Sequence, residues 1–313
     1  MFGEAEIVVP AELADLHQKY SGESGRAWIS ALPALAAMCI DHWRLQIDGA
    51  SAFGAVALII PVARRDGSKA VLKLQPVDDE TGGEPAALQA WAGRGAVRLL
   101  EHEAGSGAML LERLDAARDL TVVEDDLAAA RIIAELLVEL NSVRAPAGMR
   151  RLSDIAAATL AEAPDAVRLA GDADERRLLS ECAARVDAMT TDPIEDRLLH
   201  WDLHYFNVLC TLDGSQRWTA IDPKPLSGDS GFELMPALWN RWEDLIRTGD
   251  LTRALLRRFD VMTEVMALDR SRATTWTLAR VLQNAVWDLV RFNEPHIQSS
   301  QRTIAQILID KRA

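Results

Sequence analysis

Apolar positions in the first hundred residues follow first a helical and then a strand-like period. A helical spacing over residues 12–22 and 26–38 predicts two short helices. Three apolar runs then predict strands at 43–47, 55–63 and 69–75. Asp66-Gly67, between the second and third of these strands, is typical of a hairpin turn.

A second group of strands follows a loop rich in Asp, Gly and Pro at residues 76–85. The pattern predicts a helix at 86–91 and strands at 97–102 and 108–113. These elements predict a meander of about five antiparallel strands, with one helix inserted after the third. A short join is expected at 114–117.

From residue 121 onward the apolar spacing is mostly helical. Helices are predicted at 125–140, 152–163, 174–189, 234–247, 251–266, 272–292 and 299–309. Short strands and loops interrupt this period over 198–211 and 218–222. The sequence therefore predicts an α+β protein with two lobes, a small antiparallel β-rich lobe over residues 1–114 and a larger helical lobe over residues 115–313.

Length and charge support a two-lobed globular protein and argue against two other classes. A chain of 313 residues is longer than one typical core needs. The formal net charge of −13 argues against nucleic-acid binding, because phosphate backbones favour basic surfaces, and it favours a cationic ligand. The longest apolar stretch, residues 29–40, is shorter than the roughly 20 residues that span a bilayer, so we expect no membrane contact.

Three widely spaced cysteines, Cys39, Cys182 and Cys210, form no metal-ligand pattern. Residues 1–6 also lack the basic region of a signal peptide. Both features predict buried free thiols in a cytoplasmic protein. We expect a monomer or a weak dimer.

The segment His200-Trp-Asp-Leu-His-Tyr-Phe-Asn207 carries the chemistry and admits two interpretations. His200, Asp202 and His204 alternate, so on a strand they would share a face and could bind a metal, as in metallohydrolases. Hydrolytic metal sites usually recruit further histidines, however. The remaining histidines, at positions 17, 42, 102 and 296, are isolated in the sequence.

Phosphoryl transfer is the second interpretation of this segment. It needs a carboxylate to accept the proton of the attacking hydroxyl, and oxygen ligands for Mg²⁺. Asp202 supplies the catalytic base, while Asn207 and Asp222, at the end of an apolar strand, supply the magnesium ligands. This order and spacing match the kinase signature.

Upstream residues fit the same reaction. Lys73, within Val-Leu-Lys-Leu, is expected to neutralise nucleotide phosphate charge, with Glu84 as its partner. The alternatives are an edge lysine with its stem packed on the sheet and a charge that complements a helix N-terminus. Gly49, Ser51 and Gly54 mark a phosphate-covering loop, because small residues let backbone amides approach phosphate, although a plain hairpin would look the same.

These motifs together resemble the aminoglycoside phosphotransferase superfamily. Within it, Ile221-Asp-Pro-Lys224, Leu110-Leu-Glu-Arg-Leu114 and Trp287-Asp-Leu289 resemble the branch of streptomycin 6-phosphotransferases and hydroxyurea phosphotransferases. The resemblance extends over roughly residues 43–292, and it implies a protein-kinase-like fold with ATP as co-substrate and Mg²⁺ as cofactor. It also implies that the backbone from Glu112 to Leu114 hydrogen-bonds adenine and that His200 braces the catalytic loop.

Three positions depart from the superfamily. Ser51 replaces the middle glycine of the phosphate loop, Trp201 the usual glycine of the catalytic motif, and Phe206 a commonly polar residue. Trp201 and Phe206 are expected to reshape the acceptor site. Lys224 could contact phosphate, pair with Asp229 or form a surface ion pair.

The acceptor is expected to be a small cationic molecule, since aminoglycosides are polycations and the chain is acidic. The candidate acceptor-binding residues are Glu243, Trp287 and Asp288, for each of which core packing or a solvated helix face is the alternative. The resemblance implies transfer of the γ-phosphoryl group of ATP to an aminoglycoside hydroxyl, with position 6 of streptomycin the first candidate and antibiotic resistance the outcome. Other acceptors, such as hydroxyurea, an amino sugar or a choline-like alcohol, and a non-catalytic nucleotide-binding regulator remain alternatives.

Overall fold

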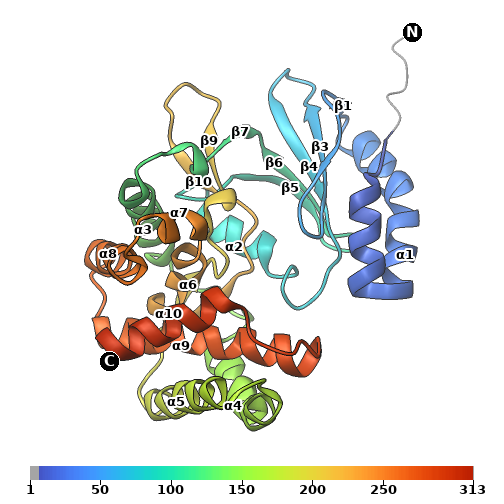
Figure 1. Ribbon diagram of the computed structural model, residues 1–313. Helices are drawn as coiled ribbons and strands as arrows, with labels where there is room; N and C mark the ends of the chain where they lie inside the picture. The colour runs from blue at the N-terminus through green and yellow to red at the C-terminus, as the bar shows by residue number, and fades with distance from the viewer. Residues whose placement is uncertain (1–6, 313) are drawn as a thin grey trace. The chain divides into compact units, whose positions relative to one another are not determined.

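The structure is a computed structural model that describes residues 7–312 (Figure 1). Its residues form two compact units. One unit runs to Asp115 and includes Thr211–Gln216, and the other comprises Ala116–Cys210 and the residues from Arg217 onward. Within the described range, no helix has the length and apolar character needed to cross a bilayer.

The first unit is built on an antiparallel sheet. Its strands are β1 (Gln46–Ile47), β2 (Ala52–Phe53), β3 (Leu58–Ala63), β4 (Lys69–Leu74), β5 (Leu99–Glu103) and β6 (Ala108–Glu112). They pair in the order β1-β3-β4-β6-β5, with β2 beside β3. Helix α2 (Glu84–Trp91) follows β4 in the chain. The predicted hairpin between β3 and β4 is confirmed, and Gly67 adopts the positive φ of 82° that its turn requires.

The predicted meander is wrong at one strand, because β6, and not β5, pairs with β4. Strand β6 is buried over residues 108–111, so it needs a neighbouring strand on each side. Strand β5, with the sequence Leu-Leu-Glu-His-Glu, is at least partly exposed throughout, and a polar strand is tolerated at a sheet edge. The long connection that contains α2 lets β5 take that edge.

Helix α1 (Ala11–His42) contains the break that the sequence predicts. Gly22, with φ 55° and ψ −123°, interrupts the helical backbone and separates two helical halves. A Cβ atom at Gly25 would lie 2.3 Å from the carbonyl oxygen of His17, so the close approach of the two halves requires glycine. The second half continues through Pro33 to His42, beyond its predicted end.

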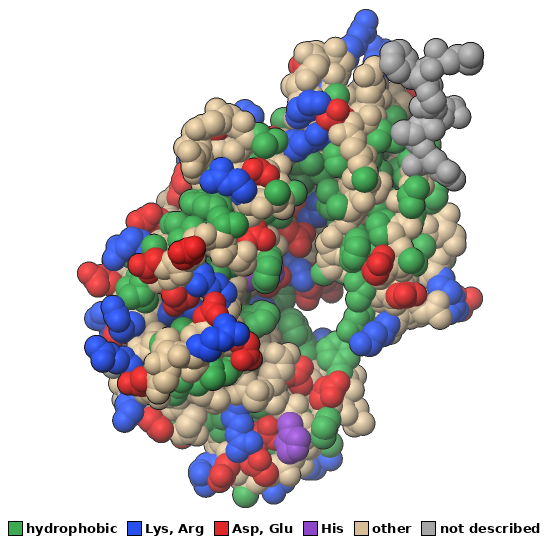
Figure 2. Space-filling model, turned by 45° about the horizontal axis from the view of Figure 1, so that its top comes forward, with side chains coloured by type: hydrophobic (Ala, Val, Ile, Leu, Met, Phe, Trp, Pro, Cys, Tyr) green, Lys and Arg blue, Asp and Glu red, His purple; other side chains and the backbone are tan. Residues whose placement is uncertain are grey.

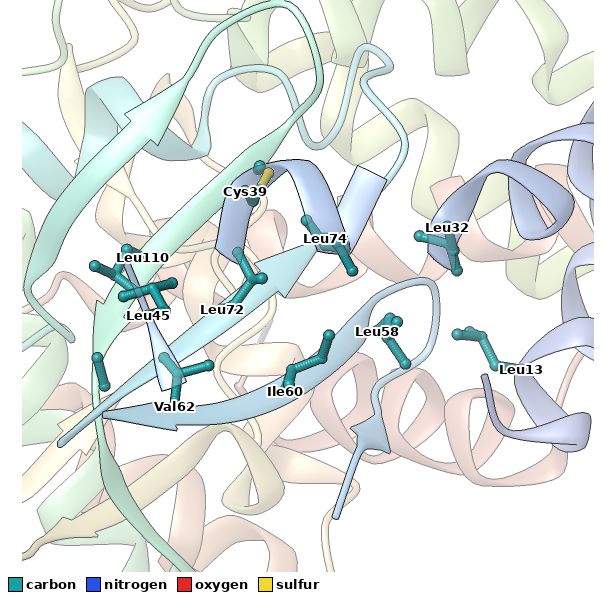
Figure 3. Close-up of a cluster of buried hydrophobic side chains, with 13 residues drawn as sticks. Leu13, Leu32, Cys39, Leu45, Leu58, Ile60, Val62, Leu72, Leu74 and Leu110 are labelled. Atoms are coloured by element: carbon teal, nitrogen blue, oxygen red, sulfur yellow. The ribbon is translucent and has the colours of Figure 1, made fainter. Parts of the chain in front are cut away.

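Alternation along the strands gives the sheet one face that packs on α1. Leu58, Ile60 and Val62 of β3 share a buried cluster with Leu72 and Leu74 of β4. The same cluster includes Leu13, Leu32 and Cys39 of α1, Leu45, and Leu110 of β6 (Figure 3). Because Lys73 lies between two of these leucines, its side chain projects from the opposite face of the sheet.

The second unit is mainly helical (Figure 1). Its helices are α3 (Asp126–Asn141), α4 (Leu152–Leu169), α5 (Ala173–Met189), α6 (Leu234–Leu238), α7 (Trp242–Arg247), α8 (Leu251–Val265), α9 (Arg270–Val286) and α10 (Ser299–Arg312). Helix α5 packs against both α4 and α9, and α3 packs against α8. The strands are β7 (Leu114–Asp119), β8 (Arg197–Leu199), β9 (Val208–Thr211), β10 (Trp218–Ala220) and β11 (Leu226–Gly228). They form two small sheets, β10-β9-β7 and β11-β8.

The expected join at 114–117 is part of strand β7, which pairs with β9. Two predictions in this part of the chain need correction. The predicted helix at 234–247 is divided into α6 and α7, because Arg241 has a positive φ of 49° and its guanidinium donates to the carbonyl oxygens of Val123 and Glu124. The predicted helix at 272–292 changes at Trp287 from an α-helix to a π-helical turn, Trp287–Arg291.

The three cysteines are free and buried, as expected. Burial raises the pKa of the Cys182 thiol to about 12, so this residue behaves as a small hydrophobic side chain. Acidic and basic side chains are interspersed on the face of the protein drawn in Figure 2.

Candidate active site

The first unit contains a buried ion pair between Lys73 and Glu84. The Lys73 ammonium donates to both carboxylate oxygens of Glu84 at 2.8 Å, and the two side chains are 4% and 1% exposed. Gln75, two residues along β4 on the same face, donates from Nε2 to Glu84 Oε2 at 2.6 Å. The first residue of α2 is thus fixed to β4. The alternative of an edge lysine, with its stem packed on the sheet and its ammonium in water, is therefore excluded, because the Lys73 ammonium is buried against a carboxylate.

The predicted phosphate loop is a tight β-hairpin. Strand β2 pairs with β3, and the Gly54 amide donates to the Ala57 carbonyl at 3.0 Å across the turn. A Cβ atom at Gly54 would meet nothing within 4 Å, so the tip is open to a ligand. His17 of α1 holds the base of this turn, because its Nε2 lies 3.0 Å from the carbonyl oxygen of Val56. Ser51 lies just before β2 and is partly buried.

The segment from Glu112 to Leu114 is held rigidly to the sheet. The Arg113 guanidinium donates to Asp48 at 2.7 Å and to the carbonyl oxygens of Val62 and Ala70 at 3.0 and 3.1 Å. The amide of Glu112 donates to the Arg98 carbonyl at 3.0 Å, and its carboxylate accepts from the same arginine. The Glu112 amide is therefore already engaged within the sheet, and the adenine contact of this segment stays a prediction.

In the second unit, His200 braces the loop that carries Asp202. Its Nδ1 accepts from the Asp202 amide at 3.3 Å, so its Nε2 carries the proton and donates to the Ile221 carbonyl at 2.9 Å. This buried ring links the catalytic loop to the residue before Asp222. With both ring nitrogens engaged, His200 is not available as a metal ligand, and residues 7–312 contain no group of three His, Cys, Asp or Glu arranged for a metal. These observations argue against the metallohydrolase interpretation.

The structure brings Asp202, Asn207 and Asp222 together. Asn207 donates from its amide nitrogen to the Asp202 carbonyl at 3.0 Å, which leaves its amide oxygen as the acceptor end. The Ile221 amide donates to the Asn207 carbonyl at 2.9 Å, so the backbone of Asp222, the next residue, lies close to that of Asn207. Asp222 has a positive φ of 56°, a strained conformation of the kind that clusters at functional sites. An amide oxygen and a carboxylate are oxygen ligands of the kind that Mg²⁺ prefers.

Lys224 lies near the proposed base and not near Asp229. Its ammonium is 3.8 Å from Asp202 Oδ2, and both side chains are about one-quarter exposed. Asp229 instead accepts from Arg272 at 2.7 Å and from the Gly231 amide at 3.0 Å. The suggested pair of Lys224 with Asp229 is therefore wrong.

Glu233 anchors the catalytic loop, a role that the sequence reasoning missed. Its carboxylate accepts from the amides of His200 and Trp201 at 2.6 and 2.8 Å, and the side chain is fully buried. Burial raises the pKa of this carboxyl to about 7, against the opposing effect of the two amide donors. The signal in the sequence was an acidic residue inside the apolar run Gly-Phe-Glu-Leu-Met-Pro-Ala-Leu.

A pocket of about 380 Å³ opens beside the catalytic loop in the second unit. It is lined by His204, Phe206, Trp239, Asn240, Arg241, Trp242, Glu243 and Asp244. His204, which lines the pocket, donates from its backbone amide to the Asp202 carbonyl at 3.0 Å. The pocket therefore lies next to the residue predicted to be the base. Asp244 is paired with Arg241 and Arg247. Glu243 is exposed and has no hydrogen-bonding or ion-pair partner among the residues that the structure describes.

The remaining candidate acceptor residues lie outside this pocket. Trp287 packs edge-on against Trp201, with ring centroids 6.1 Å apart. Burial raises the pKa of Asp288, and one of its carboxylate oxygens is buried without a hydrogen-bond partner. Trp201 itself is 1% exposed and belongs to the core, so its expected effect on the acceptor site is not a direct contact. Phe206, at 64% exposed, does line the pocket.

Comparisons with known proteins agree with this geometry. The family described as aminoglycoside/hydroxyurea antibiotic resistance kinase matches residues 42–290. The chain is 51% identical to a streptomycin 6-kinase of Streptomyces glaucescens over 90% of this chain and 91% of that protein. It is 46% identical to a hydroxyurea phosphotransferase of Kitasatospora aureofaciens over 98% of this chain and 87% of that protein.

The fold is shared with solved structures of much lower identity. A thermostable aminoglycoside phosphotransferase in its apo form is similar with a TM-score of 0.59. The two are 17% identical, and the match covers 88% of this chain and 98% of that one. This likeness confirms the expected α+β, protein-kinase-like fold.

Proposed function

Because the chain belongs to the aminoglycoside/hydroxyurea antibiotic resistance kinase family, as its motifs predicted, we propose that it transfers the γ-phosphoryl group of ATP to a hydroxyl of an aminoglycoside. The proposed acceptor is the hydroxyl at position 6 of streptomycin, because two of the similar proteins are named streptomycin 6-kinase. The observation that carries this proposal is the arrangement of Asp202, Asn207 and Asp222 on a braced loop beside a pocket. Such an activity confers antibiotic resistance. The buried free thiols support a cytoplasmic location.

Asp202 acts as the catalytic base in this proposal. Its carboxylate is partly exposed, while its backbone is held by His200, His204 and Asn207. The side chain can therefore receive the proton of the acceptor hydroxyl without moving the loop. Lys224, 3.8 Å from this carboxylate, adds positive charge where the anionic phosphoryl group arrives.

Asn207 and Asp222 hold Mg²⁺ in this proposal, and Lys73 binds the nucleotide phosphates. The metal, when bound, neutralises phosphate charge that would otherwise oppose transfer. Glu84 fixes the direction of the Lys73 ammonium through two hydrogen bonds. Gly54 lies in the turn of the β2–β3 hairpin, Ser51 just before β2, and Gly49 between β1 and β2. In this proposal the segment that these three residues span covers the phosphates, and backbone groups from Glu112 to Leu114 receive adenine.

The pocket beside the catalytic loop is the proposed acceptor site. Phe206, Trp239 and Trp242 offer aromatic surface, and Glu243 offers an unpaired carboxylate. Planar guanidinium groups, such as those of streptomycin, stack on aromatic faces and pair with carboxylates. A volume of about 380 Å³ is larger than a molecule as small as hydroxyurea needs. The pocket therefore favours the aminoglycoside over the smaller acceptor.

The direct test is nucleotide turnover with Mg²⁺ across streptomycin, other aminoglycosides, hydroxyurea and neutral amino sugars. We expect turnover that depends on streptomycin and a product phosphorylated at position 6, identified by mass spectrometry and NMR. Turnover with hydroxyurea alone would keep the mechanism and replace the acceptor. Retained nucleotide binding without turnover on any acceptor would instead support a regulator.

Replacing Glu243 by glutamine is expected to raise the KM for streptomycin about tenfold, with a much smaller change in kcat. The reason is that the substitution removes the charge of the pocket but keeps its shape. Steady-state kinetics at fixed ATP measures both constants. Glu264→Gln on α8 is the matched control and should leave KM unchanged, because Glu264 is also exposed and its carboxylate has no partner within residues 7–312. An unchanged KM in the Glu243 variant would move the acceptor site elsewhere.

A further inference from the structure

Trp201, the residue before the proposed base, has an unfavourable backbone conformation. Its φ is 67°, in the left-handed region that glycine adopts freely and bulky side chains avoid. Glycine is the usual residue at this position in the superfamily that the sequence resembles. In this chain a tryptophan, the largest side chain, occupies a backbone conformation that favours a residue without a side chain. Some other contact must hold the tryptophan in that conformation.

Arg280 of α9, which is 79 residues away from Trp201 in the sequence, supplies such a contact. Its Nη1 donates to the Trp201 carbonyl at 3.1 Å, and its guanidinium lies 4.7 Å from the indole centroid. A second guanidinium, that of Arg150, lies 4.6 Å from the same ring. Arg280 is only 9% exposed, so these interactions are only weakly screened by water.

Two further groups of Trp201 are held by other residues, while its buried indole N–H has no hydrogen-bond partner among residues 7–312. Its amide donates to Glu233 at 2.8 Å, and its indole packs edge-on against Trp287. Glu233 therefore holds the amide, and Arg280 holds the carbonyl oxygen. The ring is contacted by Arg280, Arg150 and Trp287. By contrast, the contact that orients the Asp202 amide, to His200 Nδ1, is long at 3.3 Å. The Asp202 carbonyl is held by His204 and Asn207. The peptide group that precedes Asp202 is instead held mainly through the Trp201 carbonyl, which accepts from Arg280, so the direction of Asp202 also depends on the conformation of Trp201.

We propose that Arg280 is a positioning residue for the catalytic base. It holds Trp201 in the left-handed conformation through one hydrogen bond and one cation–π contact, and thereby aims the Asp202 carboxylate. This inference rests on the proposed kinase function, since it assigns the base to Asp202. Arg280 itself does not contact substrate in this scheme.

Arg280→Met and Arg280→Lys test the proposal by kinetics. The methionine variant should lower kcat at least tenfold while the KM values for ATP and acceptor stay within twofold. Lysine keeps the charge and a donor but not the planar stack, so it should restore kcat only in part. Arg270→Met, on the first turn of the same helix and paired at the surface with Asp260, is the control and should be unaffected.

A double-mutant cycle with Trp201→Gly separates positioning from general stability. Glycine reaches a φ of 67° without assistance, so Arg280→Met should change kcat less than threefold in the Trp201→Gly background. An equal loss of kcat in both backgrounds would overturn the proposal. So would an Arg280→Met enzyme that loses thermal stability but keeps the wild-type kcat of its folded fraction.

Amide hydrogen exchange gives a second readout that needs no turnover and no glycine variant. Peptides that cover residues 198–207 should exchange at least tenfold faster in Arg280→Met than in Arg270→Met, while peptides from β3 and β4 should not change. Equal exchange of the catalytic loop in the two variants would overturn the positioning role. A wild-type enzyme without turnover, but with this difference in exchange, would count against the proposed function alone.

Discussion

Replacing Asp202 by asparagine is expected to lower streptomycin-dependent turnover about a thousandfold, because general-base catalysis typically contributes about 10²–10⁴-fold. The substitution keeps the shape of the side chain. It removes the negative charge, and with it both the ability to accept a proton and the ion pair with Lys224. The backbone amide and carbonyl of residue 202, which make the contacts with His200, His204 and Asn207, are unchanged by it. The loop should therefore keep its conformation.

Single-turnover kinetics with Mg²⁺, ATP and acceptor would measure this loss directly. Nucleotide affinity, measured by calorimetry, should stay within about twofold of the wild type, since binding does not use the base. Asp165→Asn, at an exposed position of α4 paired with Arg168, is the matched control. A variant that retained more than a tenth of wild-type turnover would remove Asp202 from the role of base.

The catalytic loop could be predicted from sequence because its members are close together in the chain. Asp202, Asn207 and Asp222 lie within about twenty residues, and the loop geometry that joins them is local. The Lys73–Glu84 pair was also predictable, because strand alternation places the lysine on the face away from the apolar core. In both cases, short-range periodicity and spacing carried the information.

Features that depend on distant residues were not predictable. Strand β6 takes a central position because it is apolar on both faces, and only the finished sheet reveals which strand it pairs with. The Trp201 carbonyl accepts from Arg280, 79 positions away. The loop anchor, Glu233, is 33 positions from His200. No local pattern indicates such partners, although an acidic residue in an apolar run marks a carboxylate that needs some buried partner.

Lys73→Met is expected to abolish most turnover and also to weaken the fold. The variant leaves the Glu84 carboxylate buried, with the Gln75 amide as its hydrogen-bond donor, and breaking a buried pair costs about 3–5 kcal/mol of unfolding free energy. A loss of activity in this single variant would therefore have two possible causes. Urea unfolding and turnover have to be measured together.

The double variant Lys73→Met/Glu84→Gln separates these causes. The glutamine removes the unpaired charge but keeps an oxygen that can accept from Gln75, so most of the lost stability should return. Turnover should remain at least about a hundredfold below the wild type, because the ammonium that meets nucleotide phosphate is still missing. Lys69→Met on the same strand is the control, since Lys69 is half exposed, pairs with Asp48 and should affect neither quantity much.

The decisive comparison is between the recovery of unfolding free energy and the recovery of turnover in the double variant. If stability and turnover both returned in the double variant, Lys73 would serve only to neutralise a buried glutamate, and the nucleotide would need another cation. If stability returned and turnover did not, the buried pair would have a second purpose. Glu84 would then act by fixing the Lys73 ammonium at one place through two 2.8 Å hydrogen bonds, ready to meet phosphate charge.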